Sequence, residues 1–87
     1  MRNESALIEL HKELLKKYPT PFSARGRIQY RVVLIDLEIE IKKAKSSGCT
    51  LVEAFGVLAR HFPDKPNPLS WASAWSQVQH EKQHENI

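Results

Sequence analysis

The stretch from Ile28 to Lys45 is the longest apolar-rich run in the sequence, and the rest of the chain must pack around it. Read as a helix, it has two apolar stripes on opposite faces. The first consists of Ile28, Val32, Ile35 and Ile39, and the second of Tyr30, Leu34, Leu37, Ile41 and Ala44, with Val33 beside it. Spacings of three and four residues are typical of an amphipathic helix. A helix that is apolar on two faces predicts a central helix, covered by different elements on its two sides.

The same stretch also allows a strand, because apolar residues alternate from Ile28 to Leu34 and again from Leu37 to Ile41. Three observations favour the helix. The run contains no Gly, Pro or Asn that would turn a hairpin, and one strand of that length would be unusual. Glu38 precedes Lys42 by four residues, which is the stabilising order in a helix. Finally, both neighbouring segments read as helices, so a lone strand would lack a partner.

Capping and turn residues divide the rest of the chain into three further helices. Asn3 or Ser5 can cap the first helix, whose predicted apolar face is Leu7, Ile8, Leu14, Leu15 and Tyr18, with Leu10 alongside. Gly48 suits the left-handed position after a helix. The pair Thr50 and Glu53 forms a capping box, and Asn67 before Pro68 is a typical helix start.

We therefore predict an all-α fold, a small four-helix domain with helices at 5–18, 24–46, 50–62 and 68–80. The domain covers residues 1–80, and residues 81–87 form a polar C-terminal tail that we expect to fray. The apolar spacing predicts that the core contains Leu34, Leu37, Ile39, Phe55, Leu58 and Trp75.

Composition places the chain among ordinary globular proteins, since 41% of its 87 residues are hydrophobic and 26% are charged. No apolar run approaches the roughly 20 residues that span a bilayer, so we expect no membrane insertion. The N-terminal residues lack the unbroken apolar stretch of a signal peptide. With Cys49 as its single cysteine, the chain forms no internal disulfide, which favours a reducing, cytoplasmic location. A net charge of +3 permits a nucleic-acid partner without requiring one.

Residues 80–84 read His-Glu-Lys-Gln-His, which matches the HExxH pattern of zinc enzymes. Only three residues follow His84, so no downstream third ligand exists, and a terminal tail does not build a closed catalytic pocket. We interpret the pattern as a polar tail with weak affinity for metal at most. The sequence also lacks a Gly-rich phosphate loop and a nucleophile elbow. It therefore predicts no enzyme activity, no cofactor and no small-molecule substrate.

The turn after the central run has a different pattern. A basic helix end at Lys43 and Lys45 leads into a Gly48-Cys-Thr50 turn, then a helix with Ala54, then a helix with Ser, Trp and Gln. Residues 34–78 in this order resemble the helix-turn-helix segment of small DNA-binding accessory proteins of plasmids and other mobile elements. Residues 62–67, with two prolines, depart from that family because they are longer than the tight turn that precedes a recognition helix.

The resemblance implies that the last helix reads DNA. Ser73 and Gln77 on its solvent face are residue types that hydrogen-bond base edges. The cations expected to contact phosphates lie elsewhere in the sequence, and they are Arg25, Arg27, Arg31, Lys42, Lys43 and Lys45.

The alternative is a protein-interaction module, such as an adaptor, an inhibitor or a small subunit. Trp71 and Trp75 would then anchor a partner, because tryptophan is enriched at interface hot spots. Alternatively, a second copy of the chain would cover the two-faced central helix in a homodimer.

Overall fold

The computed structural model of the chain describes residues 3–19 and 29–85, and every regular element in these ranges is helical. The helices are α1 (Ser5–Lys17), α2 (Tyr30–Asp36), α3 (Glu38–Ser46), α4 (Leu51–His61) and α5 (Pro68–Glu85). The predicted all-α class is confirmed. The count is five instead of four because the central run forms two helices.

The central run is interrupted at Leu37, whose backbone has φ −111° and ψ 12°. The end of α1 contacts this point, where Lys17 Nζ donates to the Asp36 carbonyl at 2.7 Å. Tyr18 Oη donates to Asp36 Oδ2 at 2.6 Å. Burial raises the pKa of the Tyr18 hydroxyl, and the Asp36 carboxylate raises it further, so the hydroxyl stays a donor. The prediction of one continuous helix over 24–46 was wrong within the described residues, because the chain forms two helices there, and the break carries contacts with α1 instead of a Gly or Pro. Residues 24–28 of that prediction lie outside the described residues.

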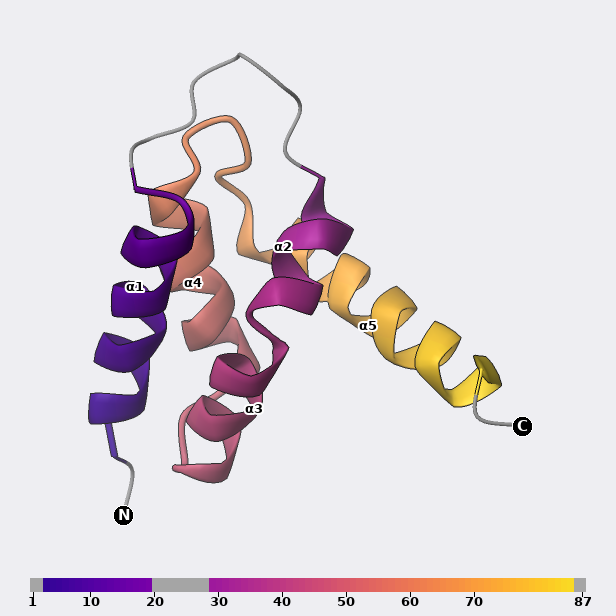
Figure 1. Cartoon of the computed structure of the whole chain (residues 1–87), viewed down its shortest axis with the longest axis horizontal. Helices are drawn as coiled ribbons and strands as arrows, with labels where there is room; N and C mark the ends of the chain where they lie inside the picture. The colour runs from indigo at the N-terminus through magenta and orange to yellow at the C-terminus, as the bar shows by residue number, and fades with distance from the viewer. Residues whose placement is uncertain (1–2, 20–28, 86–87) are drawn as a thin grey trace.

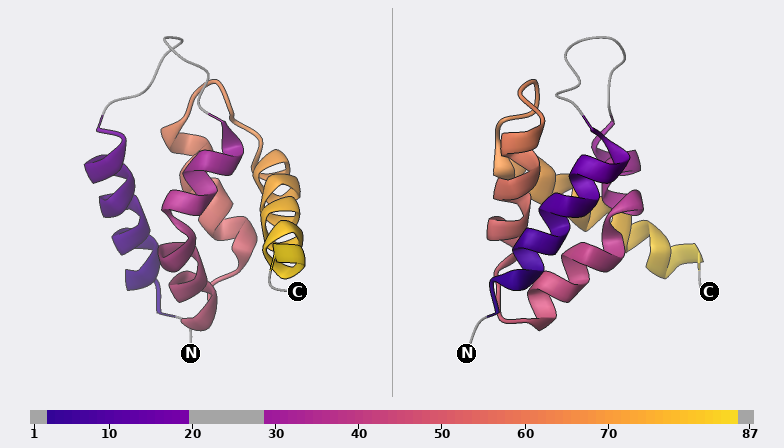
Figure 2. Two further views of the ribbon diagram at one scale, coloured as in Figure 1. Left: turned by 45° about the vertical axis from the view of Figure 1, so that its right-hand side comes forward. Right: turned by 60° about the vertical axis from the view of Figure 1, so that its left-hand side comes forward.

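The break lets the two halves of the run pack against different helices. α2 packs on α5, whereas α3 packs on α1 and α4. α4 also contacts α1 and α5, so it packs against every other described helix except α2. Figure 1 shows α1 and α4 side by side and running in the same direction. Figures 1 and 2 show the C-terminal end of α5 projecting beyond the other helices.

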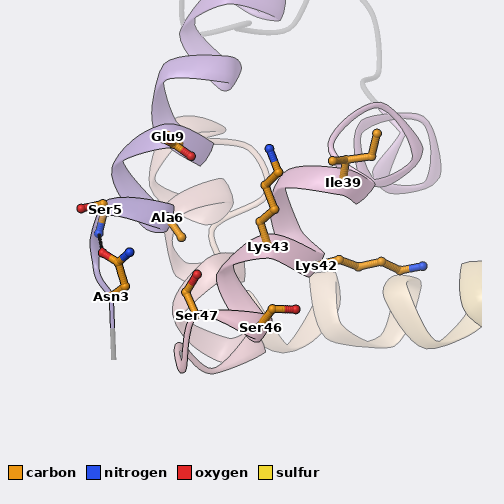
Figure 3. A pocket seen from close by; sticks show the side chains of 9 residues that line it. All are labelled: Asn3, Ser5, Ala6, Glu9, Ile39, Lys42, Lys43, Ser46 and Ser47. Carbon is orange, nitrogen blue, oxygen red and sulfur yellow. Dashed lines mark hydrogen bonds between the residues drawn. The ribbon is translucent and has the colours of Figure 1, made fainter. Parts of the chain in front are cut away.

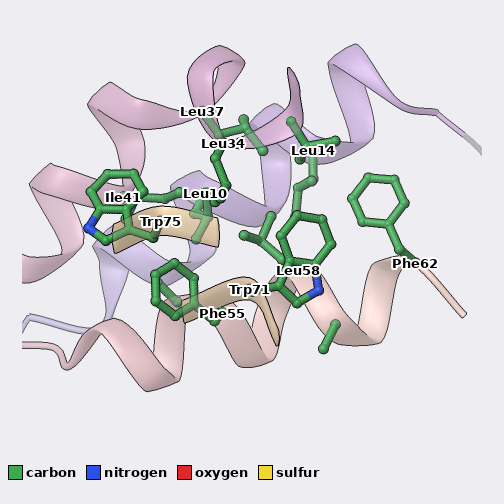
Figure 4. Close-up of a cluster of buried hydrophobic side chains, with 13 residues drawn as sticks. Leu10, Leu14, Leu34, Leu37, Ile41, Phe55, Leu58, Phe62, Trp71 and Trp75 are labelled. Atoms are coloured by element: carbon green, nitrogen blue, oxygen red, sulfur yellow. The ribbon is translucent and has the colours of Figure 1, made fainter. Parts of the chain in front are cut away.

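One apolar core joins all five helices (Figure 4). Its largest fully buried side chains are Trp71, Phe55, Phe62, Leu10, Leu14, Leu34, Leu37, Ile41, Leu58 and Val33. The Trp71 indole N–H donates to the Lys65 carbonyl at 3.0 Å, which satisfies its one polar atom. Burying an aliphatic or aromatic side chain of this size contributes about 1.5–3 kcal/mol, so this cluster is the main source of stability.

Five of the six predicted core residues are buried, and Ile39 is not. Ile39 is 66% exposed, and it lies with exposed Val32 and Ile35 on what we call the α2–α3 stripe. α2 and α3 bury only the face formed by Val33, Leu34, Leu37, Ile41 and Ala44. The prediction that both apolar faces of the central run are buried was therefore wrong. The other described helices all pack on one face of α2 and α3, and the α2–α3 stripe lies on the other face.

The apolar face predicted for the first helix also needs correction. α1 buries Ala6, Leu10 and Leu14, whereas Ile8 and Leu15 are exposed. A helix this rich in leucine offers several overlapping apolar stripes. The packing against α3 and α4 selects the one that contains Leu10 and Leu14.

The predicted helix ends are largely confirmed. Gly48 has φ 91°, the left-handed conformation expected after α3. The Thr50 hydroxyl accepts from the Glu53 amide at 3.1 Å, and Glu53 Oε1 accepts from the Thr50 amide at 2.9 Å, so the capping box is present. Asn67 Oδ1 accepts from the Leu69 amide at 3.0 Å at the start of α5. α5 continues to Glu85, beyond the predicted end at residue 80.

Candidate functional site

The solvent face of α5 carries a row of uncharged polar side chains. Ser73, Gln77 and His80 are exposed on the side of the helix opposite Trp71 and Trp75. We call these three residues the outer row of α5. Ser73 and Gln77 therefore lie on the surface, as the sequence predicts. The buried tryptophans fix the helix against α2 and α4, so the row has a rigid support.

Arg31 of α2 borders this row. Its Nη1 lies 2.6 Å from Glu81 Oε2, and Glu81 is one helical turn after Gln77. Both side chains of the pair are largely exposed, at 54% and 42%, so the pair contributes at most about 1 kcal/mol. Arg31 uses one of its five N–H donors for Glu81, so it can contact a second anion with the others. The structure brings this one predicted cation next to the predicted base-reading residues.

The predicted lysine group lies elsewhere, on α3. Lys42, Lys43 and Lys45 are exposed, but α3 packs on α1 and α4 instead of α5. Figure 3 shows Lys42 and Lys43 pointing in different directions from α3, at a shallow pocket formed with the start of α1. The three lysines thus do not share one surface with the outer row of α5.

Glu38 connects the start of α3 to the far half of α5. It accepts a hydrogen bond from Gln79 Nε2 at 2.9 Å and another from Lys82 Nζ, and Lys42 Nζ lies 3.6 Å away. The hydrogen bonds from Lys82 and Gln79 lower the pKa of the Glu38 carboxyl. This cluster surrounds the Glu38 carboxylate with two cations and an amide donor, and it joins α3 to α5 on both sides of the predicted helix end at residue 80.

Several predicted site residues are not available on the described surface. Trp71 and Trp75 are 0% and 8% exposed, so the prediction that they anchor a partner was wrong, because they pack in the core. Arg25 and Arg27 lie outside the described residues. The His80–His84 pattern falls on α5, but the His84 side chain is also outside the described part. Among the described residues, no three side chains of His, Cys, Asp or Glu are grouped to hold a metal ion. No described helix has the length and apolar character needed to cross a membrane.

Sequence reasoning missed a groove between α1 and α4, with a volume of about 970 Å³. Its apolar lining includes exposed Ile8 and Leu15 from α1 and exposed Val52 from α4. At one end, His61 Nε2 lies 2.7 Å from the Tyr18 carbonyl, and the His61 and His11 rings are 6.3 Å apart. Val52 and Gly56, one turn apart on α4 and off its buried stripe, are the sequence signal that could have revealed the groove.

A scan against protein-family models, a search of curated proteins and a search of solved structures each found no match to this chain.

Proposed function

We propose that the chain is a non-enzymatic DNA-binding module of helix-turn-helix type, in which α5 reads the duplex. The observation that carries the proposal is the outer row of α5, an exposed line of uncharged hydrogen-bonding side chains on an 18-residue helix, bordered by Arg31. An α-helix fits the major groove of B-DNA, where Gln and Ser can bond base edges and an adjacent Arg can contact a phosphate.

The charge pairing near α5 supports this assignment. Glu81 and Glu38 would repel phosphates if they were unpaired. Glu81 is paired with Arg31. Glu38 is contacted by Lys82, Gln79 and Lys42. Arg31 can contact a phosphate while its Nη1 stays bonded to Glu81, because a guanidinium has five N–H donors. Lys42, Lys43 and Lys45 would then act through the longer-range positive field and not as direct contacts of α5.

The connection between α4 and α5 departs from the tight turn of the resembled family, yet it is well anchored. The Trp71 indole donates to the Lys65 carbonyl within residues 62–67, and Lys65 Nζ lies 4.9 Å from the centre of the Tyr30 ring. These contacts hold α5 at a fixed orientation to α4 and α2. A fixed recognition helix is what sequence reading requires, because base-edge bonds tolerate little misplacement.

The first test titrates the protein against random and enriched duplexes at several salt concentrations. Wild type should bind at about 50 mM salt and weaken steeply as salt rises. Arg31→Gln should weaken all sequences alike and reduce the salt slope by about one unit. Gln77→Ala should keep non-specific affinity and lose about 1–3 kcal/mol of discrimination at one base pair.

Lys12→Gln is the matched control for Arg31→Gln, because it removes one exposed cation from α1, away from α5. It should change the slope much less than Arg31→Gln. The proposal fails if wild type does not bind at about 50 mM salt, or if the two charge variants behave identically. If DNA binds but Gln77→Ala changes nothing, α5 is not the reader.

A second candidate function is self-association, and the α2–α3 stripe favours it. Val32, Ile35 and Ile39 are exposed on one surface, and their spacing is nearly symmetric about Ile35. In an antiparallel contact between two copies, Val32 would face Ile39 of the second copy. Arg31 and Glu40, each one position outside the stripe, would then meet as opposite charges. The oligomeric state in solution is the measurement that decides this candidate.

A further inference from the structure

The α1/α4 groove lies outside the outer row of α5 and has no role in the proposed DNA contact. α1 and α4 run parallel, and the outward face between them is lined by Leu7, Ile8, Leu15, Val52 and Val57 with Gly56 among them. Ile8, Leu15 and Val52 are exposed. Isolated exposed apolar residues are common, but a contiguous apolar groove is typical of a binding surface.

The space beside Gly56 is part of the groove, and the packing of the monomer does not require a glycine at this position. It lies in the middle of α4, where glycine costs about 0.5–1 kcal/mol relative to alanine. A Cβ added at Gly56 would meet no heavy atom within 4 Å. Nothing in the folded monomer therefore excludes a side chain at this position. The absent side chain leaves room in the groove for a partner to approach the backbone of α4.

The charges around the groove are arranged by sign along its length. Glu4 and Glu53 lie at the end where α1 and α4 both begin. Arg60 and His61 lie at the end where both helices finish. A helix lying antiparallel to α1 and α4 would place its N-terminus at the basic end and its C-terminus at the acidic end. Acidic first turns and basic last turns are also what the helix dipole favours, so one ordinary amphipathic helix satisfies both conditions.

We infer that the α1/α4 groove binds an amphipathic helix of a partner protein, antiparallel to α1 and α4. The partner helix has an apolar stripe at i, i+3 or i+4 and i+7, acidic residues in its first turns and basic residues in its last turns. α1 is 13 residues long, which corresponds to about 20 Å, so roughly four turns of the partner contact the groove. This is the helix-in-groove mode of recognition.

A second copy of this chain fits the groove less well. Among the described residues outside α1 and α4, the exposed apolar side chains gather on the α2–α3 stripe, which is interrupted at Leu37 and does not form one straight helix. A groove between two parallel helices needs a continuous helical stripe to fill it. A helix from a different protein can present such a stripe along the whole length of the groove.

The experiment measures binding of a labelled peptide of about 18 residues, long enough to form a helix, by fluorescence anisotropy. The peptide has leucines on one face, glutamates in its first two turns and lysines in its last two. A control peptide keeps the leucines and exchanges the glutamates and lysines. The first peptide should bind about five- to tenfold more tightly than the second, and raised salt should reduce the difference.

Two pairs of protein variants locate the binding site. Val52→Glu places a charge in the groove, and Val32→Glu makes the same change at a residue of similar exposure outside it, 56% against 51%. Val52→Glu should weaken peptide binding at least about tenfold, since burying an unpaired carboxylate is unfavourable, and Val32→Glu less than about twofold. Gly56→Leu should fill the groove and abolish binding. Gly56→Ala should retain most of the binding, and thermal unfolding should show both Gly56 variants folded.

Several results would overturn the inference. The groove is not a helix site if neither peptide binds, if both peptides bind equally at low salt, or if Val52→Glu and Val32→Glu have the same effect. A protein dimer that Val52→Glu dissociates and Val32→Glu leaves intact would place a second copy in the groove instead. DNA titration of Val52→Glu should give the wild-type curve, so this inference and the proposed function fail separately.

Discussion

At the scale of single residues, Glu38 makes the most consequential polar contacts among the described residues. It joins α3 to α5 through Gln79 and Lys82 and pairs with Lys42 on its own helix. Glu38→Gln should destabilise the fold by about 1 kcal/mol at neutral pH, because its partners are partly exposed. Denaturant unfolding measures this cost. Glu40→Gln, on the same helix, is the matched control and should cost less.

The Glu38 carboxylate makes the stability of the fold depend on pH, and the direction follows from its lowered pKa. Its pKa is lower in the folded state than in the unfolded chain, so its contribution is complete above the ordinary Glu value of about 4.3. The contribution is lost as the pH falls through the lower folded-state pKa. Wild type should therefore lose more stability than Glu38→Gln in this acidic range. If the stability of wild type and of Glu38→Gln falls equally as the pH is lowered, Glu38 is not the cause of the acid dependence.

At the scale of elements, α4 is the helix on which α1, α3 and α5 all pack. Leu58 is completely buried at its centre, so Leu58→Ala should cost about 2–5 kcal/mol. Val52→Ala, on the outward face of α4, should cost less than about 0.5 kcal/mol. Chemical denaturation measures both values. A cost for Leu58→Ala as small as that for Val52→Ala would contradict the packing of α4 described here.

At the scale of the whole molecule, the α2–α3 stripe is the surface that we propose for self-association. If two copies join through this stripe, light scattering should show a dimer at high concentration. Ile35→Glu should return the protein to a monomer, because the charge would lie at the centre of the contact. Ile8→Glu, in the α1/α4 groove, should leave the dimer intact. A wild-type monomer at every concentration would leave the stripe as an ordinary solvent-exposed surface.

Local sequence information was sufficient for most helix ends. The Thr50 capping box, the left-handed Gly48 and the Asn67 cap each depend on contacts within a few residues, and each is present in the structure. Ser73 and Gln77 were likewise placed on the solvent face of α5, because their spacing from Trp71 and Trp75 follows from helical periodicity alone. Periodicity predicted Trp75 as a core side chain, but it could not exclude the alternative role of interface anchor for the two tryptophans, since an anchor has the same spacing.

The sequence by itself therefore determined the helical class, most helix ends and the solvent face of α5, because these depend on dihedral preferences and on periodicity along the chain. Only the tertiary structure decided which of two apolar stripes is buried. Ile39 and Ile8 are apolar at helical spacing, yet both are exposed, since the described neighbours of α3 and α1 pack on the opposite faces of these two helices. The break at Leu37 likewise lies beside a long-range contact, since Lys17 and Tyr18, nearly twenty residues earlier in the chain, bond to Asp36. The α1/α4 groove has the same origin, because it exists only where two helices distant in sequence lie side by side.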